Sequence, residues 1–182
     1  MRWFFEPGHT EAEFRARHMM VTWVRGLFKN VGGTMVFDPE DPTKMSFQTE
    51  IDAASLWTGV QQRDDHLRST DFLDVANHPK ITFKSTGVRQ TGVHDFVVSG
   101  DLTIRGVTRS VPMEVTYLGQ WPTPWWEDGV DKGPKLRAGF SAQTRINRDD
   151  FGVSWNDKAG EGGVVVSPTI EIRIDAEAIR ED

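Results

Sequence analysis

Apolar and polar side chains alternate along much of this chain. Near the C-terminus, for example, Ile170, Ile172 and Ile174 alternate with Glu171 and Arg173. A period of two is typical of a β-strand with one buried face, because successive side chains point to opposite sides. The segments that we predict as strands, about eight in all, are Glu11–His18, Thr34–Phe37, Met45–Ile51, Ile81–Ser85, Phe96–Ile104, Val111–Tyr117, Leu136–Ile146 and Ile170–Ile174.

Strands with one apolar face and short turns between them predict an antiparallel sheet with one wet side. A sheet of about eight strands curls shut or splits into two, and closure into a barrel removes its exposed edges. A closed barrel of this size is either filled by its own side chains or holds one elongated ligand. The inward positions mix phenylalanines with small residues such as Ala16, Ala138 and Ala142. This mixture fits a tapering core and a tunnel equally well.

One stretch, Asp52–Phe83, carries the signals of a short helix between strands. Thr58 precedes Gln61 by the three residues of a capping box, which predicts a helix over Gln61–Arg68. Pro79 disfavours helix in the residue before it, so the chain returns to an extended form there.

The segment Gly119–Pro134 is predicted to be a loop, because three prolines accompany Trp121, Trp125 and Trp126. Tryptophan is enriched at interfaces, so an exposed group of these rings would suit peripheral contact with a membrane or a partner. The alternative is that the rings fold back over the mouth of the barrel or lie in a dimer contact.

Length, net charge and the N-terminal sequence limit the number of domains, the partners and the localisation that we expect. The 182 residues contain no evident linker or repeat, so we expect one domain over residues 1–182. The net charge of −6 and the lack of a basic run argue against nucleic acid as a partner. The apolar run before Glu6 is too short for a signal peptide, which leads us to expect a cytoplasmic protein.

Sequence motifs for catalysis or metal binding are missing. The histidines, at positions 9, 18, 66, 78 and 94, show no HxH, HxxxH or HExxH spacing, and the chain has no cysteine. We therefore expect no metal site and no cofactor. GxSxG, P-loop and GxGxxG motifs are also absent from the sequence, so we expect a protein that is not an enzyme.

Four pieces of the sequence resemble one family in their order and spacing. They are VRGLF (Val24–Phe28), the segment Ile51–Thr86 with its RDDHLRSTDFLDV core, SGDLTIRGVTR (Ser99–Arg109) and RDDFGVSW (Arg148–Trp155). The chain is similar in these pieces to the YceI family of lipocalin-like, polyisoprenoid-binding proteins. The resemblance implies an extended eight-stranded antiparallel barrel, a short helix closing one end, a tunnel for a long isoprenoid or fatty-acyl tail, and a homodimer.

The helix then has a physical role, because a barrel with an apolar bore exposes that bore at its ends. We expect Val60, Leu67, Phe72 and Leu73 to pack across one end. The shared phase of the alternation predicts a tunnel lining made of Phe14, Ala16, His18, Met20, Phe47, Phe83, Phe96, Val98, Leu102, Met113, Val115, Phe140, Ala142 and Ile172.

The function that we predict is the binding, sequestration or transport of a long-chain apolar ligand. A polyprenyl phosphate, an isoprenoid quinone or a fatty-acyl lipid would each suit such a tunnel. Two alternatives remain. One is an enzyme that acts on a similar lipid with His18 or His66 as a general base. The other is a ligand-free stress or interaction module with a filled barrel.

Overall fold

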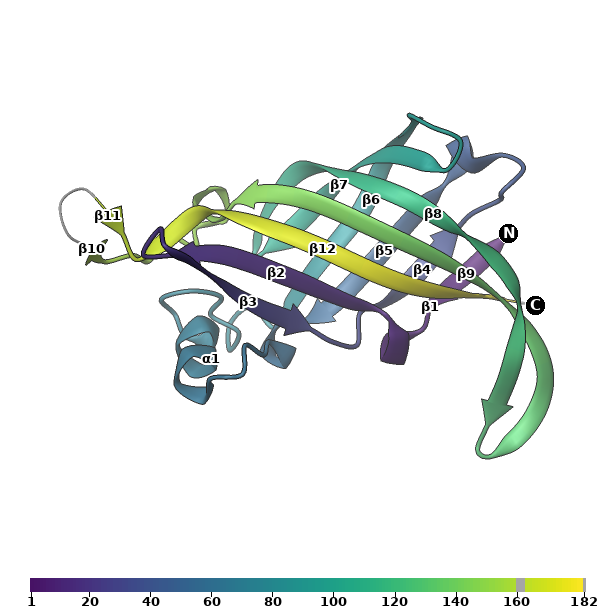
Figure 1. The fold of residues 1–182 in the computed structure, drawn as a ribbon, viewed down its shortest axis with the longest axis horizontal. Coiled ribbons are helices and arrows are strands. Elements are labelled where there is room, and N and C mark those ends of the chain that lie inside the picture. Colours follow the sequence, from purple (N-terminus) through teal and green to yellow (C-terminus); the bar gives the residue numbers. More distant parts are fainter. Residues whose placement is uncertain (160–162, 182) are drawn as a thin grey trace.

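The computed structural model describes residues 1–159 and 163–181 of the chain, and its regular structure is almost entirely β (Figure 1). The strands are β1 (Arg2–Phe5), β2 (Glu11–His18), β3 (Thr22–Phe28), β4 (Gly32–Val36), β5 (Ser46–Asp52), β6 (Lys80–Gln90), β7 (Asp95–Ile104), β8 (Val107–Glu127), β9 (Val130–Asn147), β10 (Lys158–Ala159), β11 (Gly163–Val164) and β12 (Val166–Arg180). The helices are α1 (Gln61–Arg68) and the short 3-10 turns η1 (Pro7–His9), η2 (Pro42–Lys44), η3 (Ala53–Ser55) and η4 (Arg148–Phe151).

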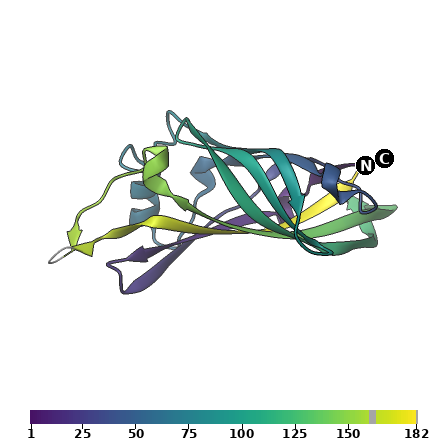
Figure 2. The ribbon, with the colours of Figure 1, turned by 90° about the horizontal axis from the view of Figure 1, so that it is seen from above.

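Eight strands form a closed ring. Their order is β1-β4-β5-β6-β7-β8-β9-β12, and antiparallel pairing of β1 with β12 closes it (Figures 1 and 2). The prediction of an all-β, eight-stranded antiparallel barrel with one short helix is confirmed. Strands β1 and β3 were not predicted, because neither shows a clean alternation. No helix in residues 1–159 or 163–181 is long and apolar enough to cross a membrane.

Strand β12 has two different neighbours on one side. Its N-terminal part pairs with β2, as far as Asp175↔Glu11, and its C-terminal part pairs with β1, from Ala178↔Phe5 onward. The turn η1 separates β1 from β2, and β3 adds to the outer edge of β2. At the β3 side, the segment that contains α1 takes the place of a further strand. Leu27 and Trp57 exchange two backbone hydrogen bonds of 2.9 and 3.0 Å there.

The helix covers the residues that the sequence predicted, Gln61–Arg68, but its capping is different. The N-cap is Val60, and no side chain caps the first turn. Thr58 instead bonds the buried Asp64 through its backbone N–H and its hydroxyl. The predicted capping box is therefore wrong, because the threonine hydroxyl has a carboxylate acceptor within the helix.

The predicted loop over Gly119–Pro134 is also wrong. Strands β8 and β9 continue together as a two-stranded ribbon out to Glu127↔Val130, and this ribbon projects from the barrel at the end that holds the termini (Figure 1). Both of its edges are unpaired beyond the barrel, so prolines lose no ladder hydrogen bond there. Trp121 and Trp126 are 57% and 61% exposed, whereas the Trp125 ring lies under the Arg137 guanidinium.

The two ends of the barrel are packed differently. Near the termini, aromatic rings fill the interior: Phe37 contacts Tyr117 and Phe140 at centroid distances of 4.9 and 5.1 Å. Trp3 is fully buried beside them, and its indole N–H donates to the Phe37 carbonyl at 2.9 Å. The other end, beneath α1, is where the interior becomes hollow.

Candidate functional site

A cavity of about 490 Å³ lies at the barrel end that α1 covers. Strands β2 and β12 contribute Phe14, Ala16, Ile170 and Ile172 to its wall. The α1 segment contributes five apolar side chains, which are Leu56, Val60, Leu67, Phe72 and Leu73. This volume falls within the range of roughly 300–1,000 Å³ that is usual for small-molecule sites.

A second cavity, of about 130 Å³, lies deeper in the barrel. Five residues line both spaces, so the two cavities adjoin; these are Phe14, Phe28, Ile81, Ile104 and Ile172. The deeper space continues past Phe47, Phe83 and Ala142. The interior therefore offers an elongated apolar path that begins under α1 and ends against the packed aromatic end.

The α1 segment is held over the larger cavity by polar contacts. Arg68 donates to the carbonyls of Ala54 and Leu56, upstream of the helix. Arg63 donates to the hydroxyl and the carbonyl of Thr58, at 2.7 and 3.0 Å. These bonds satisfy carbonyls that the irregular backbone leaves without helical or sheet partners. The polar face of α1 therefore fixes the apolar side chains of the segment above the cavity.

A second segment, Arg148–Trp155, closes the cavity from the β12 side. Arg148 is 5% exposed and donates hydrogen bonds to the carbonyls of Val153 and Trp155, at 2.6 and 2.9 Å, and to two carbonyls of β12. Burial lowers the pKa of the Arg148 guanidinium below its ordinary value, and the neighbouring Asp149 opposes that shift. The guanidinium thus organises the segment so that Phe151 and its apolar neighbours face the cavity.

Arg105 joins the two covering segments. It lies in the turn between β7 and β8 and donates to the carbonyls of Thr70 and Gly152, each at 2.8 Å. Aromatic rings meet at the same place: the His66 ring contacts Phe72 and Trp155 edge-on, at 5.0 and 4.7 Å between centroids. The cover of the cavity is therefore built from contacts between the two segments.

The polar residues that line the larger cavity share one electrostatic character. They are Arg17, His18, Gln62, Arg63, His66 and Arg148. No aspartate or glutamate is among the described residues that line it. Within residues 1–159 and 163–181, neither Arg63 nor Arg148 forms a salt bridge of its own. The site combines an apolar interior with positive charge and hydrogen-bond donors.

Comparison with known proteins identifies the family. The family model described as YceI-like domain matches residues 3–178. The chain belongs to the YceI family. A UPF0312 protein of Pseudomonas putida is 32% identical over 97% of this chain and 84% of its own. Protein YceI of Escherichia coli is 39% identical over 81% of this chain and 73% of its own.

Solved structures share the YceI fold. A Campylobacter jejuni YceI protein is 26% identical, with a TM-score of 0.74 over 91% of this chain and 90% of its own. BcnA of Burkholderia cenocepacia is 23% identical, with a TM-score of 0.75 over 92% and 95% of the two chains. A domain from Saccharophagus degradans is 14% identical and has a TM-score of 0.66 over 98% of each chain.

Eleven of the fourteen predicted lining residues border one or both cavities of this YceI barrel. Ala16 and His18 line the larger cavity, and Phe14 and Ile172 line both. The others line the deeper cavity, and they are Phe47, Phe83, Leu102, Met113, Val115, Phe140 and Ala142. The four residues predicted to pack across the end of the barrel, Val60, Leu67, Phe72 and Leu73, all line the larger cavity.

Three predicted lining residues border neither cavity. Met20 lies in the turn between β2 and β3 with its φ at 61°, and its side chain is 47% exposed, because the strand ends at His18. Phe96 and Val98 do point inward and are buried at 2% and 0% exposure. They lie where the interior is solid, so they belong to the packed core.

The cavity-lining residues of the Arg148–Trp155 segment were not predicted from the sequence. Phe151, Val153 and Trp155 all border the larger cavity. Their spacing of two residues was a usable signal. In the sequence, this segment stands out only by its resemblance to the YceI family. Ile104 and Ile146, at the ends of predicted strands, also line the larger cavity and were not predicted to do so. The position of a residue at a strand end does not indicate whether a cavity lies beside it.

Proposed function

We propose that this protein binds a long-chain apolar lipid, such as a polyisoprenoid, an isoprenoid quinone or a fatty-acyl chain, with its tail inside the barrel. The observation that carries this proposal is the pair of adjoining apolar cavities, of about 490 and 130 Å³, at the end covered by α1. A filled barrel would have no reason to keep so large an apolar space, because each empty volume in a core is destabilising.

The driving force is the removal of the tail from water. Burial of each methylene group contributes about 0.8 kcal/mol, and the loss of translational, rotational and chain freedom opposes it. A chain of many methylene or isoprene units has enough apolar surface to offset these costs. The family comparison supports the same function, since the Saccharophagus degradans domain with this fold is described as polyisoprenoid-binding.

The head group is expected at the larger cavity, near the arginines. Arg63 bonds Thr58 through its Nε and Nη2 atoms, and no hydrogen bond within residues 1–159 and 163–181 uses its Nη1 atom, which could donate to a ligand. The described wall of the larger cavity has no carboxylate, which favours an anionic or acceptor-rich head group there, such as a phosphate, a carboxylate or a quinone carbonyl. The tail would then extend past Ile172 towards Ala142.

Native mass spectrometry of purified protein, followed by extraction with organic solvent, tests the proposal directly. We expect a co-purified isoprenoid or acyl lipid at near one per chain, or stoichiometric uptake on incubation with polyprenyl phosphates, quinones and fatty amides. A mass that stays at that of the bare chain after these incubations would point to a ligand-free module.

The position of the head group has its own test. We expect Arg63→Gln to weaken the binding of a fatty acid by about tenfold and that of the matching fatty alcohol much less. Only the carboxylate of the acid would form a charge-assisted hydrogen bond with Arg63, and only that bond is lost. Arg89→Gln, an exposed arginine on β6 outside both cavities, is the matched control. Equal loss for acid and alcohol would place the head group elsewhere.

An enzymatic function has one observation in its favour. His66 lines the cavity, and its Nε2 atom lies 2.9 Å from an Asp71 carboxylate oxygen, an arrangement that would suit a general base. We propose binding instead, because the His66 ring packs against both Phe72 and Trp155 as part of the cover. Turnover of a bound lipid that is abolished by His66→Asn would favour the enzyme.

A further inference from the structure

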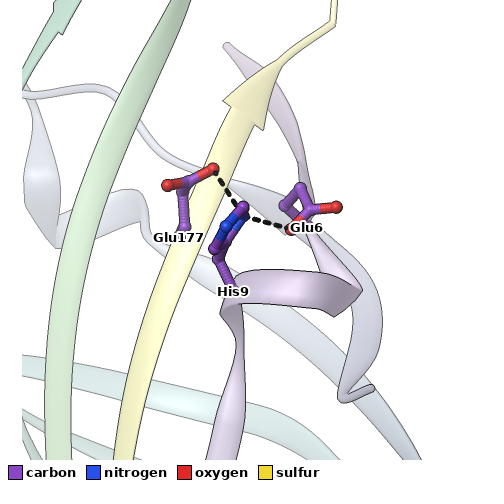
Figure 3. Close-up of side chains that lie close together, drawn as sticks. All are labelled: Glu6, His9 and Glu177. Atoms are coloured by element: carbon purple, nitrogen blue, oxygen red, sulfur yellow. Dashed lines mark ion pairs between the residues drawn. The ribbon is translucent and has the colours of Figure 1, made fainter. Parts of the chain in front are cut away.

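The junction of three strands gathers a histidine and two glutamates far from the cavity. Glu6 is the residue before the turn η1 and His9 is its last residue; η1 separates β1 from β2. Glu177 lies on β12 at the point where that strand changes its neighbour (Figure 3). Glu6 donates its backbone N–H to the Glu177 carbonyl at 2.9 Å, which aligns the two residues. The three side chains then converge on one small space.

The distances within this cluster suit a metal ion. The His9 Nδ1 atom lies 2.8 Å from Glu6 Oε2 and 3.8 Å from Glu177 Oε1, and the three donor atoms all lie within 4.8 Å of one another. A tetrahedral zinc ion with bonds of about 2.0–2.2 Å separates its ligands by roughly 3.4 Å. The two distances from His9 Nδ1 lie on either side of that value, so the donor atoms are close to the spacing that a common metal centre requires.

The surroundings of the two glutamates also favour a metal ion at this cluster. Glu6 Oε2 is shielded from solvent, and within the described residues the His9 Nδ1 atom at 2.8 Å is its partner. Glu177 accepts a hydrogen bond from Arg137 through Oε1. A carboxylate that ligates a metal is commonly held by a further donor of this kind. The cluster therefore combines a solvent-shielded carboxylate oxygen beside the imidazole with a second carboxylate that Arg137 already orients.

We propose that Glu6, His9 and Glu177 bind a divalent first-row transition metal ion, with Zn²⁺ as the best match. Imidazole nitrogen with carboxylate oxygen is a donor set of zinc, and three protein ligands leave a fourth position for water. The His9 side chain is 68% exposed, so that fourth position would face solvent. The ion would link η1 to β12 and so stabilise the junction at which both β1 and β2 pair with β12. This inference is independent of lipid binding.

Isothermal titration of tag-free protein with zinc chloride tests the site, with Mg²⁺ as the comparison ion. We expect one Zn²⁺ per chain, no measurable Mg²⁺ binding, and a weakening of Zn²⁺ affinity by more than about tenfold in both His9→Asn and Glu6→Gln. His94→Asn is the matched control, since His94 is exposed and belongs to no such cluster within the described chain. We also expect Zn²⁺ to raise the melting temperature of the unaltered protein and not that of His9→Asn.

The ligand atom gives a second readout. Nitrogen NMR of the imidazole rings is expected to show that Zn²⁺ shifts the Nδ1 signal of His9 as the metal-bound nitrogen and leaves Nε2 as the protonated one. Glu177→Gln also removes the partner of Arg137 and can fail to fold. If Glu177→Gln does not fold, His9→Asn alone tests the metal site, because it alters an exposed side chain. Absence of saturable Zn²⁺ binding, or undiminished affinity in His9→Asn, would overturn the site.

Discussion

Thr58 donates two hydrogen bonds to one oxygen of Asp64, from its backbone N–H at 2.9 Å and from its hydroxyl. The Asp64 residue is only 3% exposed, and Arg63 donates in turn to the Thr58 hydroxyl at 2.7 Å. This network joins the first turn of α1 to the strand-like residues that precede it. Since Val60, Leu67 and the rest of that segment cover the larger cavity, the network also sets how well the cavity is closed.

Replacing Asp64 with alanine is expected to loosen the cover. The change leaves the partly buried Thr58 N–H without its acceptor, which costs about 1–3 kcal/mol of unfolding free energy. Urea unfolding measures that loss, and hydrogen exchange of the α1 amides should show faster opening of the segment. Asp65→Ala is the neighbouring control, because Asp65 lies on the exposed side of α1 and its ion pair with Arg68 contributes little. Equal losses for the two variants would contradict the role given to Asp64.

Ala142→Trp separates a tunnel from a filled core. Ala142 lines the deeper cavity, so an indole there should fit within existing space and block the path of a long tail. We expect binding of long-chain lipids to be lost while the fold survives. In a filled barrel the same change would overpack the core and cost about 1–3 kcal/mol. Gln143→Trp, one residue along β9 on the exposed side, controls for the added ring.

The two ends of the molecule should respond differently to loss of tryptophan. Trp3 is fully buried and bonds the Phe37 carbonyl, so Trp3→Ala is expected to cost about 3–5 kcal/mol. Trp126 on the ribbon is 61% exposed, and Trp126→Ala is expected to change the unfolding free energy by no more than about 0.5 kcal/mol. Denaturant titrations of both variants provide the comparison. A large loss in Trp126→Ala would mean that the ribbon contributes to stability through contacts of its own.

Tyr117 makes stability depend on alkaline pH. Burial raises the pKa of its phenol above the ordinary value of 10.0. The unfolded chain therefore ionises first, so the contribution to stability is complete below about pH 10 and is lost as the pH rises towards the folded pKa. Tyr117 is the only tyrosine, so absorbance of the phenolate follows this group alone. Tyr117→Phe should flatten the alkaline loss of stability; a phenol that titrates at its ordinary pKa would refute the prediction.

Period-two alternation predicted the architecture well, because burial of one face is a local property of a strand. Ile170, Ile172 and Ile174 lie on β12 as the pattern indicated, and the helix has its predicted bounds, Gln61–Arg68, although the predicted capping box does not form. The ribbon was missed for an equally local reason. Prolines at 122 and 124 are forbidden in central strands but tolerated where both edges are free, and the sequence does not show where neighbouring strands stop.

The sequence by itself determined which face of each strand points inward, because side chains alternate with the backbone and apolar groups leave water. The tertiary structure alone decided how deep in the barrel each inward residue lies and which residues or cavities it contacts. Phe96 and Phe83 share the inward direction, yet the first is in solid core and the second borders a cavity. Glu6 and Glu177 meet only because the first and last strands of the ring close on each other. Depth and long-range pairing come from the closure of the whole chain, and no local pattern encodes them.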